Sequence, residues 1–216
     1  ILHGGEPLLP GYCNLKERIK IIEALFGDRL IGWSIQSSLV GLTQQIIELL
    51  AQHRFHVGTS YDSFRFKRHP NLLEHWGRQV ALLRRAGFVP GVSWTPGRGD
   101  DPQAVAEALM SHGFLTVHVD RCIGPDCPSN AEHAKLLQQM YEVQQETGFV
   151  FGVIEAAKVV LHGKSADRWG TRCRRDFQVL GLDGEHHFCP DRSIHWQDNL
   201  FRDRREAVLR TTQCSG

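Results

Sequence analysis

The chain has 216 residues, of which 41% are hydrophobic and 23% are charged, and its formal net charge is +1. This length suffices to bury the core of one domain, with a small appendage. The near-neutral charge gives no reason to expect nucleic acid or an anionic membrane as a partner, and no apolar run approaches the ~18 residues of a membrane span. We therefore expect a cytoplasmic protein that works without nucleic acid and without a membrane.

Strand-like and helix-like segments alternate along most of the chain. Apolar runs typical of buried strands are predicted at residues 1–3, 30–36, 55–60, 88–94, 114–119 and 149–154. Apolar side chains at helical spacing predict helices at residues 14–26, 42–53, 72–85, 102–112 and 131–147. Asn14 is expected to cap the first helix, and Gly87 to end the third. Repeated strand-then-helix units indicate an α/β fold with a parallel sheet and right-handed crossovers, the units following one another like the staves of a barrel.

The pattern changes toward the C-terminus. Residues 177–182 alternate like a strand, Asp183-Gly184 is a strong hairpin-turn signal, and residues 185–188 would form the return strand. We therefore predict two domains, at residues 1–163 and 164–216.

Polar residues follow the predicted strands, where parallel α/β barrels carry their reactive groups. They are Glu6 after the first strand, Gln36, Ser37 and Ser38 after the second, Ser60 and Asp62 after the third, Trp94 and Thr95 after the fourth, and His118 and Asp120 after the fifth. The sequence therefore predicts a polar pocket at one edge of the sheet.

Three strand ends resemble motifs of the radical S-adenosylmethionine (SAM) enzymes. The segment Gly4-Gly5-Glu6-Pro7 is similar to the GGEP motif, whose carboxylate helps to hold the amine of the cofactor's methionine. Ser34 to Ser38 resembles the family's Q-T-N strand end, with Ser38 in place of the usual Asn. Val57 to Asp62 resembles the S-x-D strand end, whose polar groups lie along the SAM ribose.

The resemblance implies a fold and a set of SAM contacts. The fold would be a partial, TIM-like (β/α)6 barrel with its first stave missing from this sequence. Glu6, Gln36, Ser38, Ser60, Asp62 and His118 would bind the cofactor, together with Gly4, Gly5 and Pro7. Arg65 or Arg68 would pair with the SAM carboxylate, since a carboxylate favours a guanidinium, and the sequence does not choose between them. The alternative for each motif is ordinary: GGEP also forms turns, and S-x-D also caps helices.

Five of the six cysteines fall into two groups, and the sixth, Cys13, follows a Pro-Gly turn and is expected to be inert. The C-x10-G-x4-C spacing of Cys173 and Cys189 is similar to the opening of the SPASM and twitch extensions, in which thiolates hold an auxiliary iron–sulfur cluster, and Cys214 follows at a family-like distance. A zinc site, or cysteines that merely pack, are the alternatives. Cys122 and Cys127 are expected in a structured loop rather than as a ligand pair. The triplet C-x3-C-x2-C that would bind the catalytic [4Fe-4S] cluster does not occur in this sequence, and the resemblance places it upstream.

The resemblance implies a radical SAM enzyme that cleaves SAM reductively to a 5′-deoxyadenosyl radical for hydrogen abstraction. The extension is typical of members that modify a peptide or protein side chain, and a flavodoxin or ferredoxin would be the reductant. One alternative is a non-catalytic module that binds SAM or a nucleotide. Another is a barrel hydrolase or lyase that uses Glu6, Asp62 and His118 directly, although they lack a recognised acid–base spacing.

Overall fold

The computed structural model describes residues 1–2, 6–120, 122, 127–162, 179–180 and 186–187. The chain divides into two compact units, Ile1–Ala156 and Ala157–Gly216. The domain boundary predicted from the sequence, between residues 163 and 164, lies a few residues after this division.

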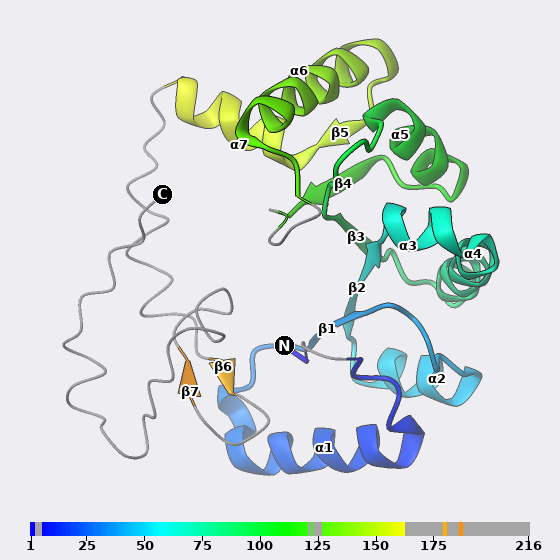
Figure 1. Cartoon of the computed structure of the whole chain (residues 1–216). Helices are drawn as coiled ribbons and strands as arrows, with labels where there is room; N and C mark the ends of the chain where they lie inside the picture. The colour runs from blue at the N-terminus through cyan, green and yellow to red at the C-terminus, as the bar shows by residue number, and fades with distance from the viewer. Residues whose placement is uncertain (3–5, 121, 123–126, 163–178, 181–185, 188–216) are drawn as a thin grey trace. The chain divides into compact units, whose positions relative to one another are not determined.

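The described elements alternate as the sequence pattern indicates (Figure 1). The strands are β1 (Ser34–Ser37), β2 (His56–Tyr61), β3 (Gly91–Trp94), β4 (Thr116–Val119), β5 (Val150–Phe151), β6 (Val179–Leu180) and β7 (His186–His187). The helices are α1 (Gly11–Phe26), the 3-10 turn η1 (Gly27–Arg29), α2 (Gln44–Gln52), α3 (Ser63–Arg68), α4 (Pro70–Arg85), α5 (Pro102–Ser111), α6 (Asn130–Thr147) and α7 (Gly152–Leu161).

The first unit contains a five-stranded sheet in the order β1-β2-β3-β4-β5, and every pair in it is parallel. Leu2 extends this order, because it forms a parallel bridge with Ile35 on the free side of β1. Its N–H donates to the Ser34 carbonyl at 2.8 Å, and its carbonyl accepts the Gln36 N–H at 3.0 Å. Each crossover therefore moves one position in the same direction, which confirms the α/β class and the parallel sheet.

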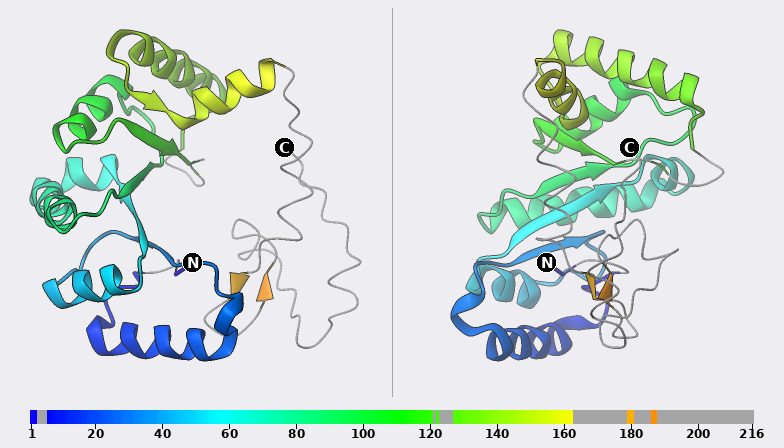
Figure 2. Two further views of the ribbon diagram at one scale, coloured as in Figure 1. Left: turned by 180° about the vertical axis from the view of Figure 1, so that it is seen from behind. Right: turned by 90° about the vertical axis from the view of Figure 1, so that its left-hand side faces the viewer.

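Crossovers of one handedness and one direction put all their helices on the same side of a sheet. Figure 1 shows α2, α4, α5 and α6 outside the arc of strands. The right-hand view of Figure 2, which looks from the left-hand side of Figure 1, shows the strands in front of these helices. The core lies between the two layers. Its largest fully buried side chains include Trp76 of α4, Trp94 of β3 and Phe151 of β5.

Several element boundaries differ from the sequence expectations. The first helix begins at Gly11 with Pro10 at its N-cap, so Asn14 lies inside it and does not cap it. The expected strand at 30–36 is limited to β1, because residues 30–33, between η1 and Ser34, are in neither a helix nor a strand. Gly87 follows α4 with a φ of +88°, in the left-handed conformation expected where a helix ends.

Two helices were not predicted. Helix α3 follows β2 directly in a segment rich in basic residues, which has too few apolar positions to show a helical period. Helix α7 begins at Gly152, where the apolar run 149–154 indicated a strand. A short apolar run does not distinguish a strand from a buried helix, and here it belongs to both.

The predicted C-terminal hairpin is confirmed for its four described residues. Val179 pairs with His187 and Leu180 with His186 in antiparallel register. The turn between them, together with Cys173, Cys189 and Cys214, lies outside the described residues.

Candidate functional site

The two faces of the parallel sheet differ in chemistry because successive side chains of a strand point to opposite sides. In β2, Val57, Thr59 and Tyr61 are buried beneath the helices, whereas His56 and Ser60 are exposed. We call the first side the covered face and the second the open face. The open face is unusual, because parallel sheets are normally apolar on both sides.

Four polar side chains cross the open face from β1 to β4, and we call them the polar row. They are Gln36, Ser60, Ser93 and His118. Ser60 is the register partner of Ser93, and Ser93 is the partner of His118. Gln36 Nε2 donates to the Ser60 hydroxyl at 3.1 Å and lies 3.3 Å from the Ser93 hydroxyl. The two serine oxygens are 3.4 Å apart.

A glycine makes room for the start of the polar row. Gly58 is the register partner of Gln36, and a Cβ added to it would lie 2.0 Å from Gln36 Oε1. The Gln36 side chain therefore lies across the backbone of β2, where only glycine leaves space for it. This contact directs the amide toward Ser60 and Ser93 rather than away from the sheet.

The Glu6 carboxylate binds the carboxyl end of β1. Its Oε1 accepts hydrogen bonds from the Ser37 hydroxyl and, at 3.2 Å, from the Leu8 N–H. Its Oε2 accepts from the Ser38 hydroxyl and, at 2.7 Å, from the Ser38 N–H. Four donors thus fill the acceptor positions that a carboxylate offers. Pro7 begins the turn that leads from Glu6 toward α1.

The backbone beside Glu6 is strained. Leu39 has a φ of +65°, which a leucine rarely adopts. Its side chain is 0% exposed, and its N–H donates to the Ser37 hydroxyl at 2.9 Å. Burial and this bond hold the strained conformation in place, so the end of β1 is rigidly shaped where it meets Glu6. Strain of this kind concentrates at functional sites.

The remaining predicted SAM contacts lie on α3, after β2. Asp62 is exposed and caps α3, since its Oδ1 accepts the Arg65 N–H at 2.9 Å. Arg65 and Arg68 are exposed and line an open depression with residues 69–72 at the start of α4. The Arg68 guanidinium lies 3.9 Å from the centre of the Phe64 ring. Both arginines of α3 therefore line this depression, which does not include the residues of the polar row.

A buried carboxylate organises the loop after β3. The Asp100 side chain is only 3% exposed, and it accepts hydrogen bonds from the Ser63 hydroxyl and from the Gly97 N–H at 2.9 Å. Lys67 Nζ lies 2.9 Å from its Oδ1, and Trp94 Nε1 lies 3.4 Å from its Oδ2, the oxygen that accepts from Ser63 and Gly97. Burial, and secondarily the negative charge of Asp100, raise the pKa of the nearby Tyr61 hydroxyl. The network fixes this loop against the start of α3.

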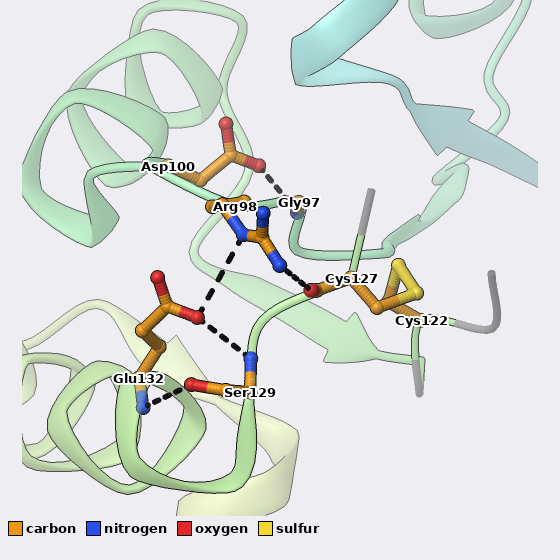
Figure 3. The surroundings of a disulfide bond; sticks show 7 residues. All are labelled: Gly97, Arg98, Asp100, Cys122, Cys127, Ser129 and Glu132. Atoms are coloured by element: carbon orange, nitrogen blue, oxygen red, sulfur yellow. Dashed lines mark hydrogen bonds and ion pairs between the residues drawn. A yellow bond between two sulfur atoms is a disulfide. The ribbon is translucent and has the colours of Figure 1, made fainter. Parts of the chain in front are cut away.

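The loops after β3 and β4 are joined through Arg98 (Figure 3). Cys122 and Cys127 form a disulfide in the second loop, and Arg98 Nη2 donates to the Cys127 carbonyl at 3.3 Å. Arg98 Nε lies 3.7 Å from the Glu132 carboxylate, which also accepts the Ser129 N–H at 2.7 Å. The sequence expected a structured loop here, and the disulfide supplies its closure.

Three titratable side chains, His118, Asp120 and Glu132, lie near the end of β4 and at the start of α6. His118 Nε2 lies 3.2 Å from Asp120 Oδ1, and the His118 side chain is 73% exposed. The pKa of Glu132 is lowered by its hydrogen bonds with Ser129, and further by the nearby Arg98.

The structure brings together most of the described residues that the sequence proposed. Gln36, Ser60 and His118 belong to the polar row, and Glu6 and Ser38 meet at the end of β1. Asp62, Arg65 and Arg68 lie apart on α3, and Gly4 and Gly5 lie outside the described residues. Ser93 and Asp100 were missed. The alternation of Val92, Ser93 and Trp94 within a strand is the signal that places Ser93 on the open face.

Within the described ranges, no group of three or more His, Cys, Asp or Glu side chains is arranged to hold a metal ion. Among the residues whose structure is described, no helix combines the length and the apolar character needed to cross a membrane.

The fold and the site define an α/β protein with an open polar face on a parallel sheet. No family model matches the chain. An uncharacterized protein of Methanothermobacter thermautotrophicus is 35% identical over 60 residues, which are 28% of this chain and 23% of that protein. The chain therefore matches less than a quarter of that protein's length.

Proposed function

We propose that this chain is the core of a radical SAM enzyme, a partial (β/α)6 barrel that binds SAM on its open face near the carboxyl ends of β1 to β3. The observation that carries the proposal is the polar row beside the bound Glu6 carboxylate. The unidirectional strand order with helices on one side supports the barrel, because a barrel's interior is the face that its helices leave free.

The chemistry of the site fits the polar parts of SAM. A carboxylate suits the methionine ammonium, and amide and hydroxyl groups suit a ribose diol. Because four donors already surround Glu6, the ammonium would take the place of one serine hydroxyl. The Ser38 hydroxyl is the natural one to yield, since a hydroxyl rotates whereas the Ser38 N–H is fixed.

In this proposal, each part of the chain has a defined task. SAM bound to a reduced [4Fe-4S] cluster would supply a 5′-deoxyadenosyl radical for hydrogen abstraction. Glu6 and Ser38 would orient the methionine end, and Gln36 with Ser60 would orient the ribose. His118, at the far end of the polar row, would be a further SAM contact. For the substrate, a peptide or protein side chain is our proposal. A flavodoxin or ferredoxin would deliver the electron.

Turnover of SAM tests the enzyme directly. The complete protein would be reconstituted anaerobically with iron and sulfide, reduced with dithionite and supplied with SAM. We expect a broad visible charge-transfer band after reconstitution, before reduction, and the formation of 5′-deoxyadenosine once the reduced protein receives SAM. SAM binding without 5′-deoxyadenosine would favour the alternative of a non-catalytic binding module. Neither binding nor turnover would reject the proposal.

The role of Glu6 has its own test. Glu6→Gln should weaken SAM binding to the complete protein by about 1.5–3 kcal/mol, the scale of a hydrogen bond to a charged group. Glu17→Gln, an exposed position on α1, is the matched control and should leave the affinity unchanged. Calorimetry that gives equal affinities for the two variants would exclude Glu6 from the site.

A further inference from the structure

The Cys122–Cys127 disulfide closes a short loop between β4 and α6 (Figure 3). The two Cα atoms are 5.4 Å apart, within the usual range for a disulfide. Both cysteines are half-buried, so a small thiol can reach them. Bond formation and cleavage therefore require neither a large backbone movement nor opening of the core.

This disulfide adds little to the stability of the fold. The stabilisation from a disulfide grows with the length of the loop that it closes, and here the cysteines are only 5 positions apart. The segments on both sides are already fixed. Val119 pairs with Trp94 in the sheet, and Ser129 with Glu132 forms a capping box at the start of α6. Cleavage of the disulfide should therefore change the structure near Cys122 and Cys127 and leave the sheet and α6 unchanged.

Arg98 carries such a local change to a second loop. Among the described residues, its polar partners both lie in the β4–α6 segment: the Cys127 carbonyl at 3.3 Å and the Glu132 carboxylate at 3.7 Å. Two residues further along, Asp100 anchors the same loop to Ser63 and Lys67. The position of the Cys127 carbonyl, which the disulfide ring restrains, thus fixes one side of the β3–α5 loop, and Asp100 fixes the other.

From these contacts we infer that Cys122 and Cys127 form a reversible dithiol–disulfide couple whose state sets the order of the β3–α5 loop. In the reduction, two thiol molecules each give up a hydrogen atom and become joined as one disulfide, while the Cys122–Cys127 bond is replaced by two thiols. In the oxidised state the Cys127 carbonyl holds Arg98, and in the reduced state Cys127, no longer bonded to Cys122, releases it. This couple goes beyond SAM binding and does not depend on it.

The couple is tested on the full chain without any other ligand. The protein is equilibrated in buffers with a series of ratios of reduced to oxidised glutathione, quenched with acid and alkylated, and the Cys122–Cys127 peptide is followed by mass spectrometry. We expect one reversible transition of this pair, with a change in melting temperature far smaller than that caused by a core substitution such as Trp76→Ala. A pair that stays oxidised at every ratio would be a permanent structural disulfide. A pair that stays reduced at every ratio would form no disulfide in solution. Either result overturns the inference.

Hydrogen–deuterium exchange of residues 95–101 tests the coupling. Exchange in this loop should be faster in the reduced than in the oxidised protein, and Cys122→Ser with Cys127→Ser should reproduce the reduced state. Arg98→Ala should abolish the difference between the two states while the pair still titrates. Equal exchange in the oxidised and reduced wild-type protein would show that the loops are not coupled.

Discussion

The two faces of the parallel sheet are built from the same strands but serve opposite needs. On the covered face, large apolar side chains such as Trp94 and Phe151 are fully buried against the helices. On the open face, the polar row and Gly58 expose small and hydrogen-bonding groups. If the open face binds SAM as we propose, the difference separates stability from ligand binding: substitutions on the covered face should lower stability, whereas those on the open face should change the affinity for SAM.

The covered face should show the largest effect on stability. Trp76 is 2% exposed, packs against Tyr61 and Phe114, and donates to the Thr59 hydroxyl at 2.9 Å. Trp76→Ala should lower the free energy of unfolding by about 3–5 kcal/mol, the usual cost of removing a large buried aromatic side chain. Urea denaturation measures this change. A loss of unfolding free energy below about 1 kcal/mol would mean that packing of the helices on the covered face contributes little to stability.

The buried Asp100 should come second. Asp100→Ala leaves the Ser63 hydroxyl and the Gly97 N–H without an acceptor, so we expect a loss of about 2–3 kcal/mol. Lys67→Ala removes only a mostly exposed partner and is the control, with an expected loss of less than about 1 kcal/mol. Chemical denaturation of both variants measures the difference. Equal losses would show that the ion pair, rather than the buried hydrogen bonds, carries the network.

A smaller effect should appear with pH. Burial lowers the pKa of His112, which contacts the Trp76 ring edge-on at 5.3 Å between ring centroids. The unfolded state therefore takes up the proton first, and stability should be complete at neutral pH and fall as the pH drops below about 6.5. His112→Gln should flatten this slope of the unfolding free energy between neutral and mildly acidic pH. An unchanged slope would assign the dependence to other groups.

We expect the smallest change in stability from a substitution on the open face. Gly58→Ala forces the Gln36 side chain away from β2, and its own cost should stay within about 1 kcal/mol because a flexible side chain can move. In a Gln36→Ala background the same substitution should cost nothing or stabilise. A double-mutant cycle of unfolding free energies measures the coupling. Additive effects would contradict the close contact between the two residues.

The sequence predicted the α/β class and the parallel sheet because both depend on local patterns. Apolar runs and helical spacing lie within single segments, and strand ends follow from them. For the same reason the sequence could name Gln36, Ser60 and His118 as polar residues near the ends of parallel strands. It placed them at one edge of the sheet, whereas the structure places them across the open face.

Other features could not be predicted because they depend on contacts between distant segments. Nothing near Leu39 in the sequence signals its positive φ, which is imposed by burial and by Ser37. Asp100 is one of two adjacent aspartates in a glycine-containing loop, where a solvent-exposed turn is the ordinary expectation. Its burial depends on Ser63 and Lys67, which both belong to α3.

Neighbouring residues of β2 give the most direct test of the division between the two faces, because Thr59 points to one side and Ser60 to the other. SAM would be titrated calorimetrically into the reconstituted complete protein, and unfolding would be measured in parallel. Ser60→Ala should weaken SAM binding by about 0.5–1.5 kcal/mol, the value of one neutral hydrogen bond, without changing stability. Thr59→Val should lower stability and leave the affinity unchanged. An affinity that depends on Thr59, or that does not depend on Ser60, would contradict the account.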